Sequence, residues 1–280
     1  MTAYNVSGSA KAQTTTDRYI FYSEGDHTMK IGVCTSIENM QRAIAAGADF
    51  IEVSNKDLAA ISEEAFEKLS ALVTRPDYVY CSNGLVPPEI RLTGPDVDYD
   101  SLREFSERSF ARTASLGVKT LVFGSSKAKV VPEGFSFDEA WEQLVNVTRI
   151  FADVAAKHGQ TVVIEPLRRE ECNIINEVSE SVKLAQLADR ENVKAHVDFY
   201  HMMQNGEKLS TLANYVPFLG HVHIASPVKR TVPTFDDGAN YKAFFDTLRA
   251  GGYDGTVSFE GKGLREPGAL ETLIPFLKSL

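Results

Sequence analysis

KTLVFG (119–124) and TVVIEP (161–166) are two short apolar runs, and residues 137–158 between them follow a helical pattern. Short runs rich in Val, Ile and Phe are typical of buried parallel strands, so this segment predicts one strand–helix–strand unit. The same alternation continues in both directions along the chain. The other strand-like runs are KIGVCT (30–35), DFIEVS (49–54), DYVYCS (77–82), VKAHVD (193–198), GHVHIA (220–225) and TVSFEG (256–261).

Eight strand-like runs separated by helical stretches favour closure into a single (β/α)₈ TIM barrel over an open doubly wound sheet. No GxGxxG motif follows the first run, and about 250 residues from Met29 onward is the usual barrel size. We therefore expect one barrel domain at 29–280 after a polar extension at 1–28. Two interpretations of the extension stay open: a mobile arm, or a natural start at Met29. The expected helices are 36–46, 62–72, 99–116, 137–158, 177–188, 240–250 and 268–280.

Composition limits the classes of partner. A net charge of -9 and a pI of about 5.3 argue against nucleic acid and anionic membranes, which require a basic surface. Three scattered cysteines do not make a disulfide framework, and no apolar run is long enough to span a membrane. These features predict a cytoplasmic protein that acts on a small molecule, and they leave a homo-oligomer open.

Four consecutive predicted strands, the fifth to the eighth, end in a residue that can bind a metal. These residues are Glu165, Asp198, His223 and Glu260, each about one strand–helix unit from the next. An ionisable side chain at the end of an apolar strand is costly to bury unless it is paired or metal-bound. Three carboxylates and one imidazole predict one divalent ion, with Mn²⁺ as the first expectation and Mg²⁺, Co²⁺ or Zn²⁺ as alternatives.

Several further residues are candidates around this site. His196 and His221 lie two residues before ligands on the same strand face, so we expect them to support or underlie the ligands. His201 lies three residues past the aspartate, in the predicted loop over the site, and is expected to contact substrate. Glu52, at the end of the second run, is a weaker candidate.

The ligand set, together with the motif DFYHM (198–202), resembles the xylose isomerase-like barrel superfamily, and within it the sugar phosphate isomerase/epimerase branch that includes ketose 3-epimerases. This resemblance implies that Glu165 and Glu260 both bind the metal and transfer protons. It also implies that Glu171 and His201 contact substrate. The arginine of the family matches Arg230 if one residue is inserted, and Lys229 occupies the position without the gap.

Proton transfer next to a carbonyl is the chemistry that such a site can catalyse. A metal would polarise the carbonyl of a sugar and stabilise an enediolate, while a glutamate removes and returns a proton. Two bases on opposite faces would give epimerisation, and one base acting on both carbons would give isomerisation. The substrate is expected to be a ketose, a sugar phosphate or a related hydroxy-carbonyl compound.

Two long segments, 83–98 and 124–136, are expected to be irregular loops over the site because they contain Pro and Gly. An anionic substrate stays open because basic residues gather in the predicted loops. They are Arg91, Lys127, Lys129, Arg168, Arg169, Lys229 and Arg230.

Other functions remain as alternatives. An inosose-type dehydratase or a hydroxypyruvate isomerase-like enzyme would use the same metal and the same proton abstraction. An abasic-site endonuclease would require a histidine-rich cluster of several metals, and six histidines with none at the ends of the second to fourth runs disfavour it. A non-catalytic sugar-binding barrel is disfavoured because the full ligand set is present.

Overall fold

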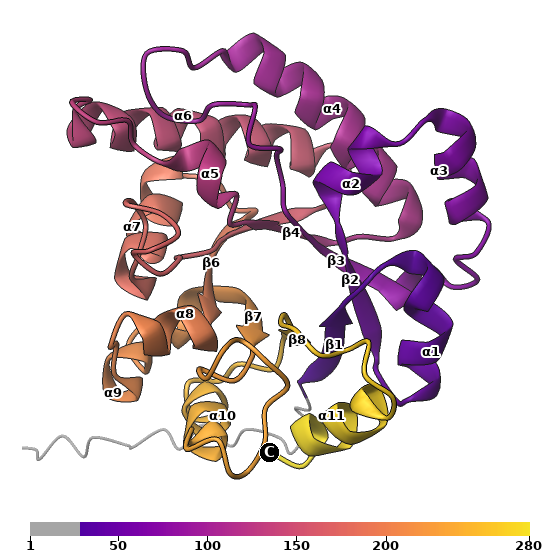
Figure 1. Ribbon diagram of the computed structural model, residues 1–280. Coiled ribbons are helices and arrows are strands. Elements are labelled where there is room, and N and C mark those ends of the chain that lie inside the picture. The colour runs from indigo at the N-terminus through magenta and orange to yellow at the C-terminus, as the bar shows by residue number, and fades with distance from the viewer. Residues whose placement is uncertain (1–28) are drawn as a thin grey trace, which may run out of the picture.

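Eight parallel strands close into a barrel in the order β1 to β8 in the computed structural model, which describes residues 29–280 (Figure 1). This confirms the predicted (β/α)₈ fold. The strands are β1 (Lys30–Cys34), β2 (Phe50–Ser54), β3 (Val79–Asn83), β4 (Thr120–Phe123), β5 (Thr161–Ile164), β6 (Val193–Asp198), β7 (Leu219–Ile224) and β8 (Thr256–Phe259). The polar extension 1–28 lies outside the described residues.

The helices surround the barrel, and seven of them match the expected stretches closely. These seven are α1 (Met40–Ala45), α3 (Glu63–Ser70), α4 (Tyr99–Leu116), α6 (Phe137–Ala156), α7 (Val178–Ala188), α10 (Tyr241–Ala250) and α11 (Ala269–Lys278). Four short helices were not expected: α2 (Asn55–Ala60), α5 (Ser126–Lys129), α8 (Phe199–Gln204) and α9 (Leu209–Leu212). None of the helices among residues 29–280 is long and apolar enough to cross a membrane.

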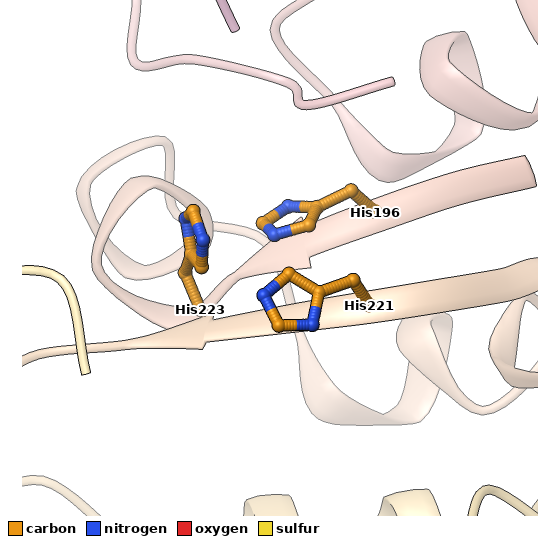
Figure 2. A group of neighbouring side chains, drawn as sticks. All are labelled: His196, His221 and His223. Carbon is orange, nitrogen blue, oxygen red and sulfur yellow. The ribbon is translucent and has the colours of Figure 1, made fainter. Parts of the chain in front are cut away.

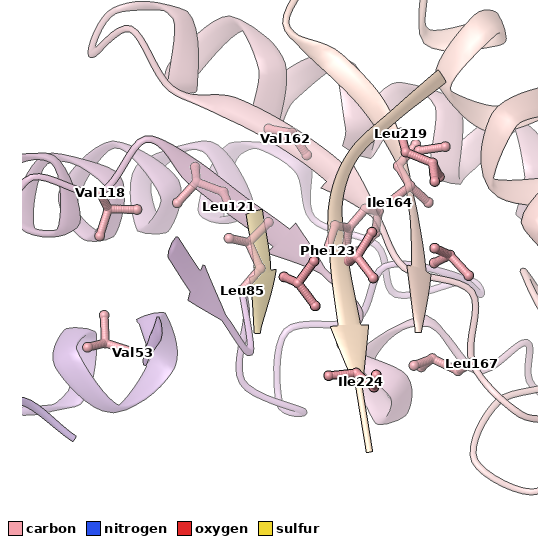
Figure 3. Packing of buried hydrophobic residues seen from close by; sticks show 14 of the residues in the cluster. Val53, Leu85, Val118, Leu121, Phe123, Val162, Ile164, Leu167, Leu219 and Ile224 are labelled. Carbon is pink, nitrogen blue, oxygen red and sulfur yellow. The ribbon is translucent and has the colours of Figure 1, made fainter. Parts of the chain in front are cut away.

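Aromatic packing joins the strands to the outer helices. Phe123 at the end of β4 packs edge-on against Phe151 of α6, with ring centroids 5.0 Å apart, and Phe151 in turn meets Phe110 of α4. Figure 3 shows Phe123 beside the apolar side chains of the neighbouring strands. Inside the barrel, Gly32 leaves room for the Phe50 ring, which a Cβ at this position would overlap. Dense packing on both sides of the sheet holds the strand ends in fixed positions.

Residues 124–136 are not wholly irregular, which corrects one expectation. Ser126–Lys129 form the single turn α5, entered through Ser125 in a left-handed conformation with φ of 41°. Pro132 and Gly134 lie beyond this turn and do not prevent it. Arg91 donates hydrogen bonds to the main-chain oxygens of Lys127 and Val130, so the two long loops are joined at the top of the barrel.

The helix α8 begins directly at the end of β6 because Asp198 caps it. Asp198 Oδ1 accepts hydrogen bonds from the backbone N–H groups of Tyr200 (2.7 Å) and His201 (3.4 Å). An aspartate at this position satisfies donors that the first helical turn leaves free. The chain therefore turns sharply after β6, and His201 stands on a helix instead of in a loop as expected.

Candidate active site

The four predicted metal ligands converge at the carboxyl end of the barrel. Glu165, Asp198, His223 and Glu260 each offer one donor atom, and these atoms all lie within 4.8 Å of one another. His223 Nδ1 lies 3.3 Å from Glu165 Oε1 and 3.3 Å from Glu260 Oε2. Neighbouring strands β5 to β8 therefore bring together residues that are far apart in sequence, as their shared position at strand ends predicts.

This cluster has an excess of negative charge that a cation would balance. Three carboxylates meet, and Arg230 is the cation in contact with them: its Nη2 pairs with Glu260 Oε2 and lies 3.2 Å from Asp198 Oδ2. Burial would raise the pKa of Glu260, but His223 and Arg230 hold it at about 2. Burial would lower the pKa of His223, but Glu52 and Glu260 raise it well above its usual value. The donor set and its charge thus fit one divalent ion.

A second buried network lies directly beneath His223, inside the barrel. Glu52 of β2 contacts His223 Nε2 at 2.9 Å through Oε1 and His221 Nε2 at 2.9 Å through Oε2. His221 Nδ1 lies 2.6 Å from the hydroxyl of Thr256 on β8. Although burial alone would raise the pKa of Glu52, the two imidazoles hold it well below its usual range. Glu52 is therefore a carboxylate that fixes two histidine rings.

His196, His221 and His223 form a compact group of rings on β6 and β7 (Figure 2). The His196 ring packs edge-on against His223, with centroids 4.4 Å apart, and both of its nitrogens are buried without a hydrogen-bond partner. Burial, together with the neighbouring His223 and His221, keeps the pKa of His196 well below its usual value. His196 is thus a neutral ring that packs beneath the cluster.

His201 lies at the edge of the cluster. Its Nδ1 accepts a hydrogen bond from the backbone N–H of Arg168 (3.2 Å), which leaves Nε2 turned toward Asp198 Oδ2 at 3.6 Å and Glu165 Oε1 at 4.0 Å. This Nε2 atom is buried and has no hydrogen-bond partner. It faces the carboxylates of the cluster, but His201 is not among the residues that line the cavity above them.

Arg230, and not Lys229, reaches the site. Both residues have a left-handed backbone conformation, with φ of 63° at Lys229 and 55° at Arg230. This conformation is uncommon for residues other than glycine, asparagine and aspartate. The Arg230 carbonyl accepts a hydrogen bond from the backbone N–H of Lys262, which fixes the loop after β7 to the segment that follows β8. The double left-handed turn rotates Arg230 inward and leaves Lys229 exposed.

Most of the other predicted basic residues form hydrogen bonds or ion pairs within the protein. Lys129 is buried and donates to the backbone oxygen of Glu165 at 3.0 Å, so it holds the chain in place directly after β5. Arg168 pairs with Glu171 at 2.7 Å, and Arg169 pairs with Glu177 at 2.7 Å. Lys127 is exposed.

Two residues of the site could not be expected from the ligand pattern. Asn83, the last residue of β3, donates to Glu260 Oε1 at 3.1 Å. The predicted strand ended one residue too early, at Ser82, so its polar end was overlooked. Gly124 follows β4, and a Cβ there would overlap Glu165 Oε2. Its missing side chain makes room for the Glu165 carboxylate.

A cavity of about 310 Å³ opens above the carboxylates. Its lining includes Glu165 and Glu260 of the cluster and Glu171 and Arg230, which we expected to contact substrate. The remaining wall is mostly small or polar: Ser54, Lys56, Asp57, Asn83, Gly84, Val86, Gly124, Ser125, Ser126 and Leu167. The cavity suits a small molecule rich in hydroxyl groups.

A closed parallel barrel with this rim cluster defines a class of (β/α)₈ proteins with an oxygen-rich candidate metal site. A model of the xylose isomerase-like TIM barrel family matches residues 40–280, and the chain belongs to this family.

Curated relatives of the chain are sugar epimerases and isomerases. It is 31% identical over 131 residues to 3-dehydro-D-guloside 4-epimerase of Escherichia coli, which covers 45% of this chain and 48% of the relative. It is 24% identical over 218 residues to D-psicose 3-epimerase of Agrobacterium fabrum, which covers 75% and 73%. The alignment with the former relative thus spans about half of its length.

A solved structure shares the fold over the whole barrel. The chain superposes on 3-keto-D-glucoside 4-epimerase from E. coli with a TM-score of 0.76 at 23% identity, covering 90% of this chain and 100% of that one.

Proposed function

We propose that this protein is a sugar isomerase or epimerase that uses one divalent metal ion and moves a proton at a carbon next to a carbonyl. The observation that carries the proposal is the convergence of Glu165, Asp198, His223 and Glu260 within 4.8 Å beneath an open polar cavity. The relatives named as epimerases support the same class of reaction.

Glu165, Asp198, Glu260 and His223 Nδ1 would hold the ion, with Mn²⁺ preferred and Mg²⁺, Co²⁺ or Zn²⁺ as alternatives. When bound, such an ion polarises a substrate carbonyl and stabilises the negative charge that develops on its oxygen.

Glu165 and Glu260 would be the acid and base. They directly follow β5 and β8, each has a carboxylate oxygen 3.3 Å from His223 Nδ1, and both line the cavity in which the substrate would bind. One glutamate takes the proton from the carbon next to the carbonyl, which leaves an enediolate, and a proton is then returned. Return from the opposite face by the other glutamate gives an epimer, whereas return to the neighbouring carbon gives an isomer.

Arg230, His201 and Glu171 would orient the sugar. Arg230 Nη2 lies between Glu260 and Asp198, and its Nη1 is 4.0 Å from Glu171. These charged groups, together with the unpartnered His201 Nε2, offer both donors and acceptors to hydroxyl groups.

Glu52 would act as a positioning residue. By accepting from Nε2–H of His223, it leaves Nδ1 as the ligand atom and fixes the plane of the ring. His221 and Thr256 would hold Glu52 in turn.

The charges favour an uncharged sugar over a sugar phosphate. Arg91, Lys129, Arg168, Arg169 and Arg230 already bind protein oxygens. In the described part of the chain, the cavity lining adds one further cation, Lys56, and it also includes the acid Asp57. A phosphate would therefore meet little net positive charge.

The test is proton exchange in D₂O. The protein is incubated with Mn²⁺ and a panel of free ketoses, ketose phosphates, keto-glycosides and inososes, and C–H signals are followed by NMR. We expect exchange next to the carbonyl of an uncharged sugar, and loss of exchange with a chelator. Exchange that persists without metal would refute the metal role, and a product lighter by one water would instead identify a dehydratase.

A further inference from the structure

A second cavity lies beside the active-site cavity, between the ends of β1 and β2 and the helices α2 and α3. Its volume is about 410 Å³. Ser54, Asp57 and Asn83 line both cavities, so the two are neighbours that share a wall. Asn83 also donates to Glu260 Oε1. Asn83 thus contacts Glu260 and also lines this second space, which we call the side cavity.

The side cavity differs chemically from the active-site cavity. Its wall contains five apolar side chains: Ile37, Val53, Leu58, Ile61 and Leu69. Ile37, Val53 and Leu58 are buried, whereas Ile61 and Leu69 are only half-buried and still accessible to a ligand. Contact between this apolar wall and an apolar group of a ligand would contribute favourable binding free energy, because it removes hydrocarbon surface from water.

Charge excludes an acidic occupant. The lining residues of the side cavity, all within the described part of the chain, include Glu38, Glu52 and Asp57 but no lysine or arginine. A phosphate or a carboxylate placed there would meet like charge without a partner. The occupant that fits is uncharged and apolar. Because the two cavities are neighbours, it can be one part of a molecule whose other part reacts in the first cavity.

We propose that the side cavity binds the apolar aglycone of a keto-glycoside whose sugar ring reacts over Glu165 and Glu260. The substrate is then a sugar joined through a glycosidic oxygen to an alkyl or aryl group, and not a free monosaccharide. This inference rests on the proposed function, since it assigns the sugar to the active-site cavity.

Methyl and phenyl 3-keto-β-D-glucopyranoside are the matched probes, since they differ only in the aglycone. We expect kcat/KM for C–H exchange to be about tenfold or more higher for the phenyl compound, mainly through KM. Leu69→Trp and Ile61→Gln, two substitutions at half-buried positions, should bring this ratio close to one. Leu187→Trp, at an exposed position on α7, should leave the ratio unchanged.

Binding of methyl and phenyl β-D-glucopyranoside, measured by calorimetry, distinguishes failure of the side-cavity proposal from failure of the proposed function. If both keto-glycosides exchange equally fast, the aglycone site is refuted while the proposed function stands. If neither exchanges, the proposed function fails for these sugars, and tighter binding of the phenyl glycoside that Leu69→Trp removes would still support the side cavity. Equal binding of both glycosides would overturn it.

Discussion

The two halves of the barrel carry different parts of the candidate site. Strands β5 to β8 supply all four donor atoms of the cluster. Strands β1 to β4 and the segments that follow them supply mainly small or polar groups, such as Asn83 and Gly124, and the apolar wall of the side cavity. Because the ends of neighbouring strands lie close together, the four donor atoms can share one ion. The second half of the barrel thus carries the candidate ligands together with Glu171 and Arg230, whereas the side cavity lies in the first half.

The largest effect is expected from the half that holds the cluster. Glu260→Gln should lower exchange at least about 10³-fold, because it removes a base and a charged ligand. NMR exchange at saturating Mn²⁺, with bound metal measured in parallel, tests this. Glu266→Gln, at an exposed position, is the matched control. If Glu260→Gln keeps more than a tenth of the activity, Glu260 is not the base.

The next test asks whether the opposite half also limits the chemistry. Gly124→Ala places a methyl group against Glu165 Oε2, so the carboxylate must move, and we expect about 100-fold lower activity with the fold intact. Steady-state kinetics and circular dichroism measure the two effects. Gly134→Ala is the control, since a Cβ there meets no atom within 4 Å and costs only backbone strain. Unchanged activity in Gly124→Ala would mean that the space left by Gly124 is not needed for the position of the Glu165 carboxylate in catalysis.

Glu52 joins the halves, since it reaches from β2 to the histidines of β7. Glu52→Gln should weaken Mn²⁺ binding about 10- to 100-fold, because the carboxylate no longer orients His223. Calorimetry gives the affinity, and Glu207→Gln, at a half-buried position outside the cluster, is the control. The expected stoichiometry stays at one ion per chain. A wild-type protein that binds two ions and loses one in Glu52→Gln would show that Glu52 is itself a ligand.

The smallest effect concerns the loop that delivers Arg230. Lys229→Gly should stabilise the protein by about 0.5 kcal/mol, because the left-handed conformation costs a lysine about 1–2 kcal/mol and glycine much less. Urea unfolding measures the change. Lys127→Gly, in the right-handed turn α5, should instead destabilise. A destabilised Lys229→Gly would mean that the lysine side chain makes contacts that outweigh the strain.

Sequence patterns predicted the barrel well because periodicity is a local property. The expected strands end within two residues of the observed ones, and the four rim ligands follow from their position at those ends. The error at Ser82 shows how much one residue matters, since the true strand end is Asn83, which contacts Glu260.

Contacts across the barrel could not be predicted in this way. The pairing of Glu52 with His221 and His223 depends on how far neighbouring strands are staggered, which no single strand encodes. The choice between Arg230 and Lys229 depends on two consecutive left-handed residues, neither of which is a glycine. The helix α8 was missed because Asp198 was interpreted only as a ligand, although its other oxygen caps the helix.

Asp198 therefore divides one carboxylate between two tasks. Oδ1 accepts from the amides of Tyr200 and His201, while Oδ2 faces Arg230 and the cluster. If an ion at Oδ2 stabilises the first turn of α8, then by thermodynamic reciprocity a well-formed first turn raises the affinity for the ion by the same factor. Slower amide hydrogen exchange at these two residues would then report occupancy of the site without any substrate, and fraying of this short helix would weaken binding of the ion.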